Sequence, residues 1–163
     1  NRHQSGTLIW EPYLYLGSAN AAASRTFLSS AAITHILNVA DDVDNEFPDD
    51  PTLTYCNLSV ADFGADPGIA RTFPQALEFV RNAREENQDA RVLVHCAAGC
   101  NRSPTVICAL LMGLHDLSLL EAFKHLRSRR RVMPLIDNLK QLILFERELS
   151  GKNTVTLDEL RRF

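Results

Sequence analysis

The chain has 163 residues, 45% of them hydrophobic and 23% charged, which is enough to bury one sizeable core and too little for two. Its net charge is -3 and its cations are thinly spread except at residues 127–131, which argues against a broad basic surface and general nucleic-acid binding. The longest apolar run, residues 106–112, is far shorter than the roughly 20 residues that cross a bilayer, so we expect no membrane span.

Alternating apolar and polar segments predict the secondary structure. In chain order, the predicted elements are strands at 8–10 and 13–17, a helix at 18–30, strands at 34–40 and 53–60, a helix from about 72 to 86, a strand at 91–96 and three helices, from 104, from 118 to about 130 and around 139–149.

Several residues mark where these helices begin and end. Ser18 is the expected cap of the first helix, and Pro74 is tolerated only in the first turn of the second. Ser118 and Glu121 predict a capping box. Gly151 is expected to end the last helix.

The order of these elements indicates a single α/β domain with a central, mostly parallel sheet flanked by helices. We expect residues 1–163 to form this one domain, with a core over about 8–150 and a C-terminal extension at 151–163. Ligands bind such sheets at the carboxyl ends of the strands. The segment that follows the strand at 91–96 is therefore the first place to look for a site.

The sequence VLVHCAAGCNRSPTV runs from that strand through a turn into a helix. The first N–H groups of a helix lack backbone partners and carry the positive end of its dipole, so the turn can hold an anion. The small residues Ala97, Ala98 and Gly99 let successive N–H groups point inward, and Gly99 can adopt a positive φ. Arg102 adds a planar fork for two oxygens of the same anion.

Cys96 stands at the mouth of this turn, and residues 96–102 are called the Cys96 loop below. The helix dipole and Arg102 should hold Cys96 as a thiolate near neutral pH. A thiolate above a bound phosphate group is a nucleophile directed at phosphorus. The loop therefore predicts a phosphate site with a reactive thiol.

The pattern Cys-x-x-Gly-x-x-Arg-Ser after an apolar strand and a His resembles the signature of the cysteine-dependent protein phosphatases. The segments LYLGSA, ITHILNVA and LKQLILFERELS are similar to the dual-specificity branch of that superfamily, in particular its atypical members. The resemblance implies hydrolysis of phosphotyrosine, phosphoserine and phosphothreonine in phosphorylated protein substrates, through a cysteinyl-phosphate intermediate. It implies no metal or other cofactor, because the thiolate and Arg102 do the work that a metal pair does elsewhere.

The resemblance also implies a role for each matching residue. Cys96 would attack phosphorus, and Arg102 would bind the phosphate oxygens together with the backbone of Ala97, Ala98, Gly99, Cys100 and Asn101. Ser103 matches the hydroxyl that assists breakdown of the intermediate, although it could serve only to start the helix. His95 is expected to support the loop by hydrogen bonds.

A general acid is also needed, because an alkoxide or phenoxide leaves poorly unless it is protonated. The family places an Asp on the loop before the long helix, which is the segment SVADFGAD in this chain. Asp62 is the better match, as the first carboxylate beyond the strand. Asp66 is the competitor, and next to Pro67 it could be a plain surface acid.

The substrate is less closely defined than the chemistry. The Cys96 loop has no basic side chain at its variable positions, unlike relatives that act on inositol lipids, and no segment matches the pocket-deepening loop of strictly tyrosine-specific relatives. Arg130 could meet a second phosphate, or it could belong to a solvated helix end. Asn101 is similar to the RNA 5'-triphosphatases, whereas Ser103-Pro104 is not, so a phosphatase of RNA 5'-ends or another non-protein ester is one alternative.

One position departs from the family pattern. The family usually has Pro-Asn where this chain has Pro134-Leu135, and that Asn helps to brace the catalytic loop. Either Asn138 substitutes for it, or the loop is less firmly held. The second case leaves a phosphate-binding adaptor of low activity as another alternative.

The cysteines carry two further expectations. Cys56 or Cys100 could capture an oxidised Cys96 as a reversible disulfide, or both could be inert packing residues, and Cys108 is expected in the core. The four cysteines lack the spacing of a zinc site or a secreted disulfide scaffold, and the N-terminus does not resemble a signal peptide. We therefore expect an intracellular protein, cytoplasmic or nuclear, and a domain taken from a longer chain, since the sequence begins without Met.

Overall fold

The computed structural model describes residues 4–62 and 66–163. The elements in chain order are β1 (Thr7–Trp10), β2 (Leu14–Gly17), α1 (Ala19–Ala22), α2 (Arg25–Ser30), β3 (His35–Ala40), β4 (Thr54–Val60), the 3-10 helix η2 (Ile69–Thr72), α3 (Phe73–Glu86), β5 (Val92–His95), α4 (Arg102–His115), α5 (Leu119–Arg129), α6 (Ile136–Ser150) and α7 (Leu157–Arg161). No helix in this described part of the chain has the length and apolar character of a membrane span.

The strands form one five-stranded sheet in the order β1-β2-β5-β3-β4. The pairs β2–β5, β5–β3 and β3–β4 are parallel, and only the β1–β2 pair is antiparallel. The predicted single α/β domain with a mostly parallel sheet is therefore confirmed. Gly17 of β2 and Asn38 of β3 are both in register with His95, so the carboxyl ends of three strands meet where the Cys96 loop begins.

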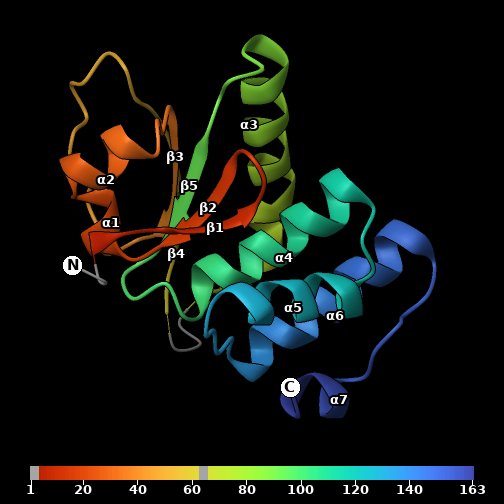
Figure 1. Cartoon of the computed structure of the whole chain (residues 1–163). Helices are drawn as coiled ribbons and strands as arrows, with labels where there is room; N and C mark the ends of the chain where they lie inside the picture. Colours follow the sequence, from red (N-terminus) through yellow and green to blue (C-terminus); the bar gives the residue numbers. More distant parts are fainter. Residues whose placement is uncertain (1–3, 63–65) are drawn as a thin grey trace.

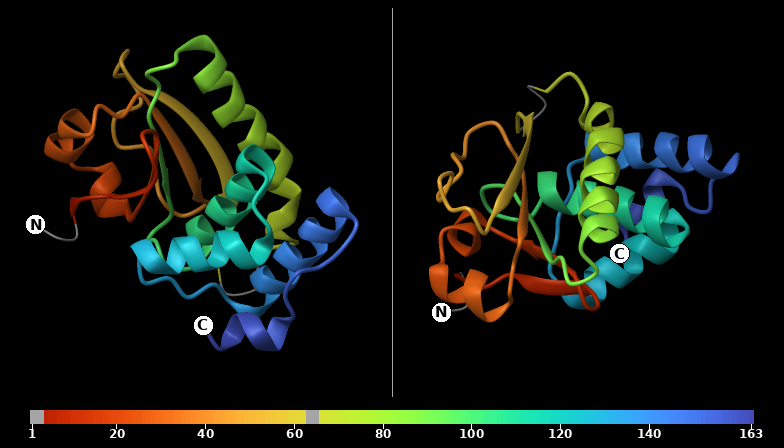
Figure 2. Two further views of the ribbon diagram at one scale, coloured as in Figure 1. Left: turned by 45° about the vertical axis from the view of Figure 1, so that its right-hand side comes forward. Right: turned by 90° about the horizontal axis from the view of Figure 1, so that it is seen from above.

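Helices cover both faces of the sheet (Figures 1 and 2). Because side chains alternate along a strand, Leu93 of β5 packs towards α1 and α2, where Phe27 and Leu28 complete a smaller core. Val92 and Val94 face the larger core, which the other helices build. The segment of α4 from Arg102 to Met112 is buried throughout, so this helix is the central support of the site.

One sequence prediction needs correction. The single helix expected over residues 18–30 is two short helices, because the Ser24 side chain accepts the N–H of Phe27 and starts a new helix there. The C-terminal extension expected at 151–163 contains α7, which begins with a capping box between Thr156 and Glu159. Val155, just before α7, and Leu160, within it, are buried in the larger core, so this segment packs on the core. The predicted capping box of Ser118 and Glu121 and the end of α6 at Gly151 are confirmed.

Candidate active site

The Cys96 loop connects β5 to α4 at the carboxyl edge of the sheet. Gly99 has φ +72°, as predicted, and a Cβ at this position would lie 2.8 Å from the carbonyl oxygen of Gly17. The N–H of Ala19 donates to Ala97 O at 2.9 Å, and the N–H of Met133 donates to Cys100 O at 2.7 Å. The loop is thus held on two sides by neighbouring backbone.

The Cys96 thiol lies at the bottom of this loop and is 2% exposed. Gly99 N–H donates to its Sγ at 3.3 Å, and Ser103 Oγ lies 3.1 Å from the same sulfur. Ser103 is fully buried at the first turn of α4. A sulfur that faces an amide donor and a hydroxyl has partners for the thiolate form.

His95 precedes the thiol and is buried. Its Nδ1 lies 3.1 Å from the carbonyl oxygen of Cys96, so a neutral ring can donate to that carbonyl. Burial lowers the pKa of His95, and the nearby charge of Arg102 acts in the same direction against the backbone hydrogen bond. His95 is therefore placed to hold the loop backbone and not to carry a charge.

Arg102 is among the largest buried side chains of the protein, at 2% exposure. Its Nη1 donates to Asp42 Oδ1 and to Val60 O, each at 2.9 Å. Among the described residues, its Nε is a buried donor without a hydrogen-bond acceptor. The guanidinium group is thus fixed from one side and retains a donor for an anion.

The sequence analysis did not identify the acidic partners of Arg102. Asp42 Oδ1 is its hydrogen-bond partner, and Asp41 Oδ1 lies 3.6 Å from the same nitrogen. The hydrogen bond with Arg102 lowers the pKa of Asp42. The available signal was a pair of carboxylates directly after a buried strand, at the edge of the sheet where ligands bind.

The two acids proposed for proton donation differ in their surroundings. Asp66 accepts the N–H groups of Ala61 and Gly68 and the guanidinium group of Arg71, all on its own side of the loop. Asp62 instead accepts Asn101 Nδ2 at 2.8 Å, and its Oδ2 lies 3.6 Å from Arg102 Nε. Asp62 is therefore the acid that contacts the Cys96 loop. Residues 63–65, which the predicted segment also contains, lie outside the described part of the chain.

Asn138 reaches the loop as well. Asn101 Oδ1 accepts the N–H of Leu135 at 2.6 Å and Asn138 Nδ2 at 3.0 Å. Leu135 left two possibilities, that Asn138 substitutes for the missing Asn or that the loop is held less firmly. The structure contains the contact that the first possibility requires, between Asn138 and the Cys96 loop. A cavity of about 320 Å³ opens beside these residues, between Asp66 and α6.

Arg130 lies on the opposite side of the loop. Its Nη1 donates to Thr7 Oγ1 at 3.1 Å, and its Nη2 is 2.8 Å from the position of a Cβ on Gly99. A cation therefore stands directly beside the predicted phosphate site.

The four cysteines are free thiols. Cys108 is fully buried in α4 as expected, and burial raises its pKa to about 12. Cys56 is half-buried in β4, and burial also raises its pKa despite a hydrogen bond from Gln75. Cys100 is exposed on the loop.

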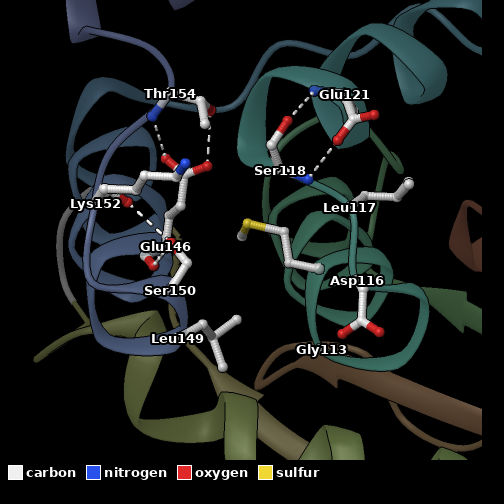
Figure 3. Close-up of a pocket in the computed structure, with 11 residues that line it drawn as sticks. Gly113, Asp116, Leu117, Ser118, Glu121, Glu146, Leu149, Ser150, Lys152 and Thr154 are labelled. Carbon is white, nitrogen blue, oxygen red and sulfur yellow. Dashed lines mark hydrogen bonds between the residues drawn. The ribbon is translucent and has the colours of Figure 1, made fainter.

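A second cavity of about 440 Å³ lies between the end of α4, the start of α5 and α6 (Figure 3). Met112 and Glu146 line it, and it contains none of the predicted site residues. The site is thus defined by the Cys96 loop and not by this larger cavity.

Comparison with known proteins identifies the class of this site. The family model "Dual specificity phosphatase, catalytic domain" matches residues 14–148. The chain belongs to the dual-specificity phosphatase family of cysteine-dependent phosphatases, and its fold and family support phosphatase activity.

Individual relatives agree with this assignment. The chain is 36% identical to human dual specificity protein phosphatase 7 over 139 residues, which cover 85% of this chain and 32% of the relative. It is 36% identical to Arabidopsis thaliana dual specificity protein phosphatase 1, covering 85% of this chain and 68% of that protein. The crystal structure of human DUSP28 matches with a TM-score of 0.79 at 28% identity, over 88% of this chain and 94% of that one. The chain spans about a third of the length of the first curated relatives that it matches.

Proposed function

We propose that this domain hydrolyses phosphotyrosine, phosphoserine and phosphothreonine in phosphorylated proteins, with Cys96 as the nucleophile. The observation that carries the proposal is the Cys96 sulfur, held between Gly99 N–H and Ser103 Oγ, in the loop that ends at buried Arg102, whose Nε has no hydrogen-bond acceptor among the described residues. We also propose that the whole sequence is one catalytic domain. The burial of Val155 and Leu160 supports the inclusion of residues 151–163 in it.

In the first step, the phosphate group of the substrate binds to the backbone N–H groups of the Cys96 loop and to Arg102 Nε–H. The Cys96 thiolate attacks phosphorus, so that an S–P bond forms and the ester P–O bond breaks. Protonated Asp62 delivers its proton to the leaving oxygen as that bond breaks. The charge that develops on the phosphate oxygens is met by donors that are already in place.

In the second step, water attacks the cysteinyl-phosphate and releases inorganic phosphate. Asp62, now a carboxylate, takes the proton of the water, while the S–P bond breaks and the thiolate is restored. Ser103 Oγ lies 3.1 Å from this sulfur and can donate a hydrogen bond to the departing thiolate. This contact supports the role that the family resemblance implies for Ser103.

The surroundings of the loop favour a protein substrate over RNA. Asp41 and Asp42 lie beside Arg102, where they oppose the accumulated charge of a polyphosphate. The Asn101 side chain, which resembled the RNA-directed branch, is already engaged inside the protein. Arg130 offers a cation for one further acidic group on the substrate, at a point beside Gly99.

The test is hydrolysis of phenyl phosphate without added metal, across pH, by the parent chain and four variants. We expect Cys96→Ser to be inactive, and Asp62→Asn to lose roughly 10²-fold or more and the alkaline limb of the pH profile, since a general acid contributes about 10² to 10⁴-fold. Cys100→Ser and Asp66→Asn are the matched controls, and both should keep most of the activity. A parent chain that binds vanadate but is as inactive as Cys96→Ser would instead identify a phosphate-binding adaptor.

A further inference from the structure

Asn101 forms hydrogen bonds through its backbone carbonyl and through both ends of its side-chain amide group. Its carbonyl oxygen accepts the N–H and the hydroxyl of Thr105 at 3.2 and 2.8 Å, which fixes its backbone at the start of α4. Its side chain then bonds in two directions, to Asp62 on one side and to Leu135 and Asn138 on the other. The residue thus joins three segments that are distant in sequence.

The hydrogen bonds that Asn101 Oδ1 accepts determine the orientation of the side-chain amide group. Oδ1 receives the backbone N–H of Leu135 and the side-chain N–H of Asn138, which occupy its two lone pairs. The amide group cannot turn over without losing both bonds. Nδ2 is therefore held towards Asp62 Oδ1, at 2.8 Å.

The two carboxylate oxygens of Asp62 face different neighbours. Asp62 lies on the segment after β4, and its side chain is 27% exposed. Its Oδ1 accepts Asn101 Nδ2, and its Oδ2 lies 3.6 Å from Arg102 Nε, on the side where the phosphate group is expected. The geometry presents one oxygen of the acid to the substrate and uses the other to hold it.

We propose that Asn101 is the positioning residue of the general acid: its Nδ2–H holds Asp62 against the Cys96 loop, with Oδ2 directed at the leaving group. This inference rests on the proposed phosphatase function and adds to it. It also gives Asn138 a defined part, since that residue helps to orient Asn101 and does not contact the acid.

The test uses two esters that differ in how much they need an acid. The leaving group of phenyl phosphate is a phenol like that of tyrosine, with a pKa of about 10, whereas the nitro group makes p-nitrophenoxide a far better leaving group. The readout is kcat/KM for each ester, which includes only the steps up to release of the phenol. The ratio of the two values measures how well the acid is placed.

We expect Asn101→Ala to lower kcat/KM for phenyl phosphate roughly tenfold or more and that for p-nitrophenyl phosphate by less than about threefold, because only the poor leaving group depends strongly on the acid. The comparison variant Asn138→Ala removes one of the two donors that orient Asn101 but leaves the Leu135 N–H and the bond to Asp62, so its ratio should shift clearly less than that of Asn101→Ala. In an Asp62→Asn background, Asn101→Ala should not change the ratio further. Asn101→Ser replaces the alanine variant if circular dichroism shows that the latter is unfolded.

An equal fall for both esters in Asn101→Ala would mean that Asn101 only supports the loop, and it would overturn the inference. A ratio shifted as strongly by Asn138→Ala, or a further shift in the Asp62→Asn background, would do the same. These results leave the proposed function intact. A parent chain that hydrolyses neither ester overturns the proposed function, and the inference with it.

Discussion

Glu146 of α6 is a buried carboxylate that ties the C-terminal segment to the core. It is 3% exposed and accepts the N–H of Leu119 at 2.7 Å, at the start of α5. From the other side it accepts the N–H and the hydroxyl of Thr154 at 2.9 and 2.7 Å (Figure 3). Asn153 Nδ2 also donates to it at 3.3 Å. The substitution Glu146→Gln keeps the shape of this side chain and removes one acceptor oxygen.

The stability lost in Glu146→Gln depends on how many hydrogen-bond donors lose their acceptor. One carboxylate oxygen binds Leu119 N–H and the Thr154 hydroxyl, and the other binds Thr154 N–H and Asn153, so an amide nitrogen at either position faces a backbone N–H. Hydrogen bonds to charged groups contribute about 1.5–3 kcal/mol each, and partial relaxation near residue 154 recovers some of this. We expect the free energy of unfolding to fall by about 3 kcal/mol, which corresponds to a fall in Tm of roughly 6–12 °C for a chain of this size.

The pH dependence gives an independent check. Burial alone would raise the pKa of Glu146, but the hydrogen bonds from Leu119 and Thr154 outweigh it and lower that pKa. A carboxyl group with a lowered pKa stabilises the fold above its unfolded pKa of about 4.3, and this contribution disappears as the pH falls through the folded value. The difference between parent and Glu146→Gln should therefore be full at pH 7 and shrink below about pH 4.

The assay is urea unfolding of parent and variant from pH 7 to pH 3, with Glu148→Gln as control. Glu148 is exposed on the same helix, so its substitution should change the unfolding free energy by less than about 0.5 kcal/mol. The reasoning would be refuted if Glu146→Gln lowered the free energy of unfolding no more than Glu148→Gln does. It would also be refuted if the difference in unfolding free energy between parent and Glu146→Gln grew as the pH falls.

Three further predictions concern the site. Asp42→Asn keeps an acceptor for Arg102 but removes a negative charge beside the phosphate site, so the inhibition constant of inorganic phosphate should fall about two- to fivefold, whereas weaker inhibition would contradict this. Gly99→Ala combines a positive φ with a 2.8 Å contact, so we expect the free energy of unfolding to fall by about 1–3 kcal/mol and kcat/KM to fall at least about tenfold. An unchanged Tm together with unchanged activity would show that the loop adapts to the extra methyl group. Iodoacetamide at pH 8 should modify exposed Cys100 but not buried Cys108 in the folded protein, and mass spectrometry showing early labelling of Cys108 would refute its burial.

The sequence predicted those features of the fold that depend on neighbouring residues. The buried strand β5 follows from a run of apolar β-branched residues, and α5 follows from its capping box, because both signals lie within a few positions. The break between α1 and α2 was missed because the composition of residues 18–30 favours a helix throughout, and only the Ser24 side chain divides it. The burial of α7 depends on contacts with distant parts of the chain, which no local pattern contains.

The site shows the same division between local and distant information. Cys96, the proposed nucleophile, and Arg102, proposed to bind the phosphate group, are six positions apart on one loop, and their pattern indicates this chemistry without any knowledge of the fold. The partners of Arg102 come from residues about 40 to 60 positions away, so no local pattern marks Asp42 as one of them. The contacts of Asp62 with the Cys96 loop, and of Asp66 with Ala61 and Arg71, likewise join residues that no local pattern brings together.

Asn101, which resembled another branch of the superfamily, and Leu135, which departs from the family pattern, contact each other in the structure. Taken singly in the sequence, the first suggested another substrate and the second suggested a poorly supported loop. In the structure Asn101 supplies an amide from the loop side, and its Oδ1 binds the backbone N–H of Leu135, a group that every residue except proline can offer. An asparagine side chain at position 135 is therefore not required for this contact, and Asn138 adds the second donor. Because the substituted positions are 34 residues apart, their complementarity depends on the fold, and a departure from a family motif is best judged after its spatial neighbours are known.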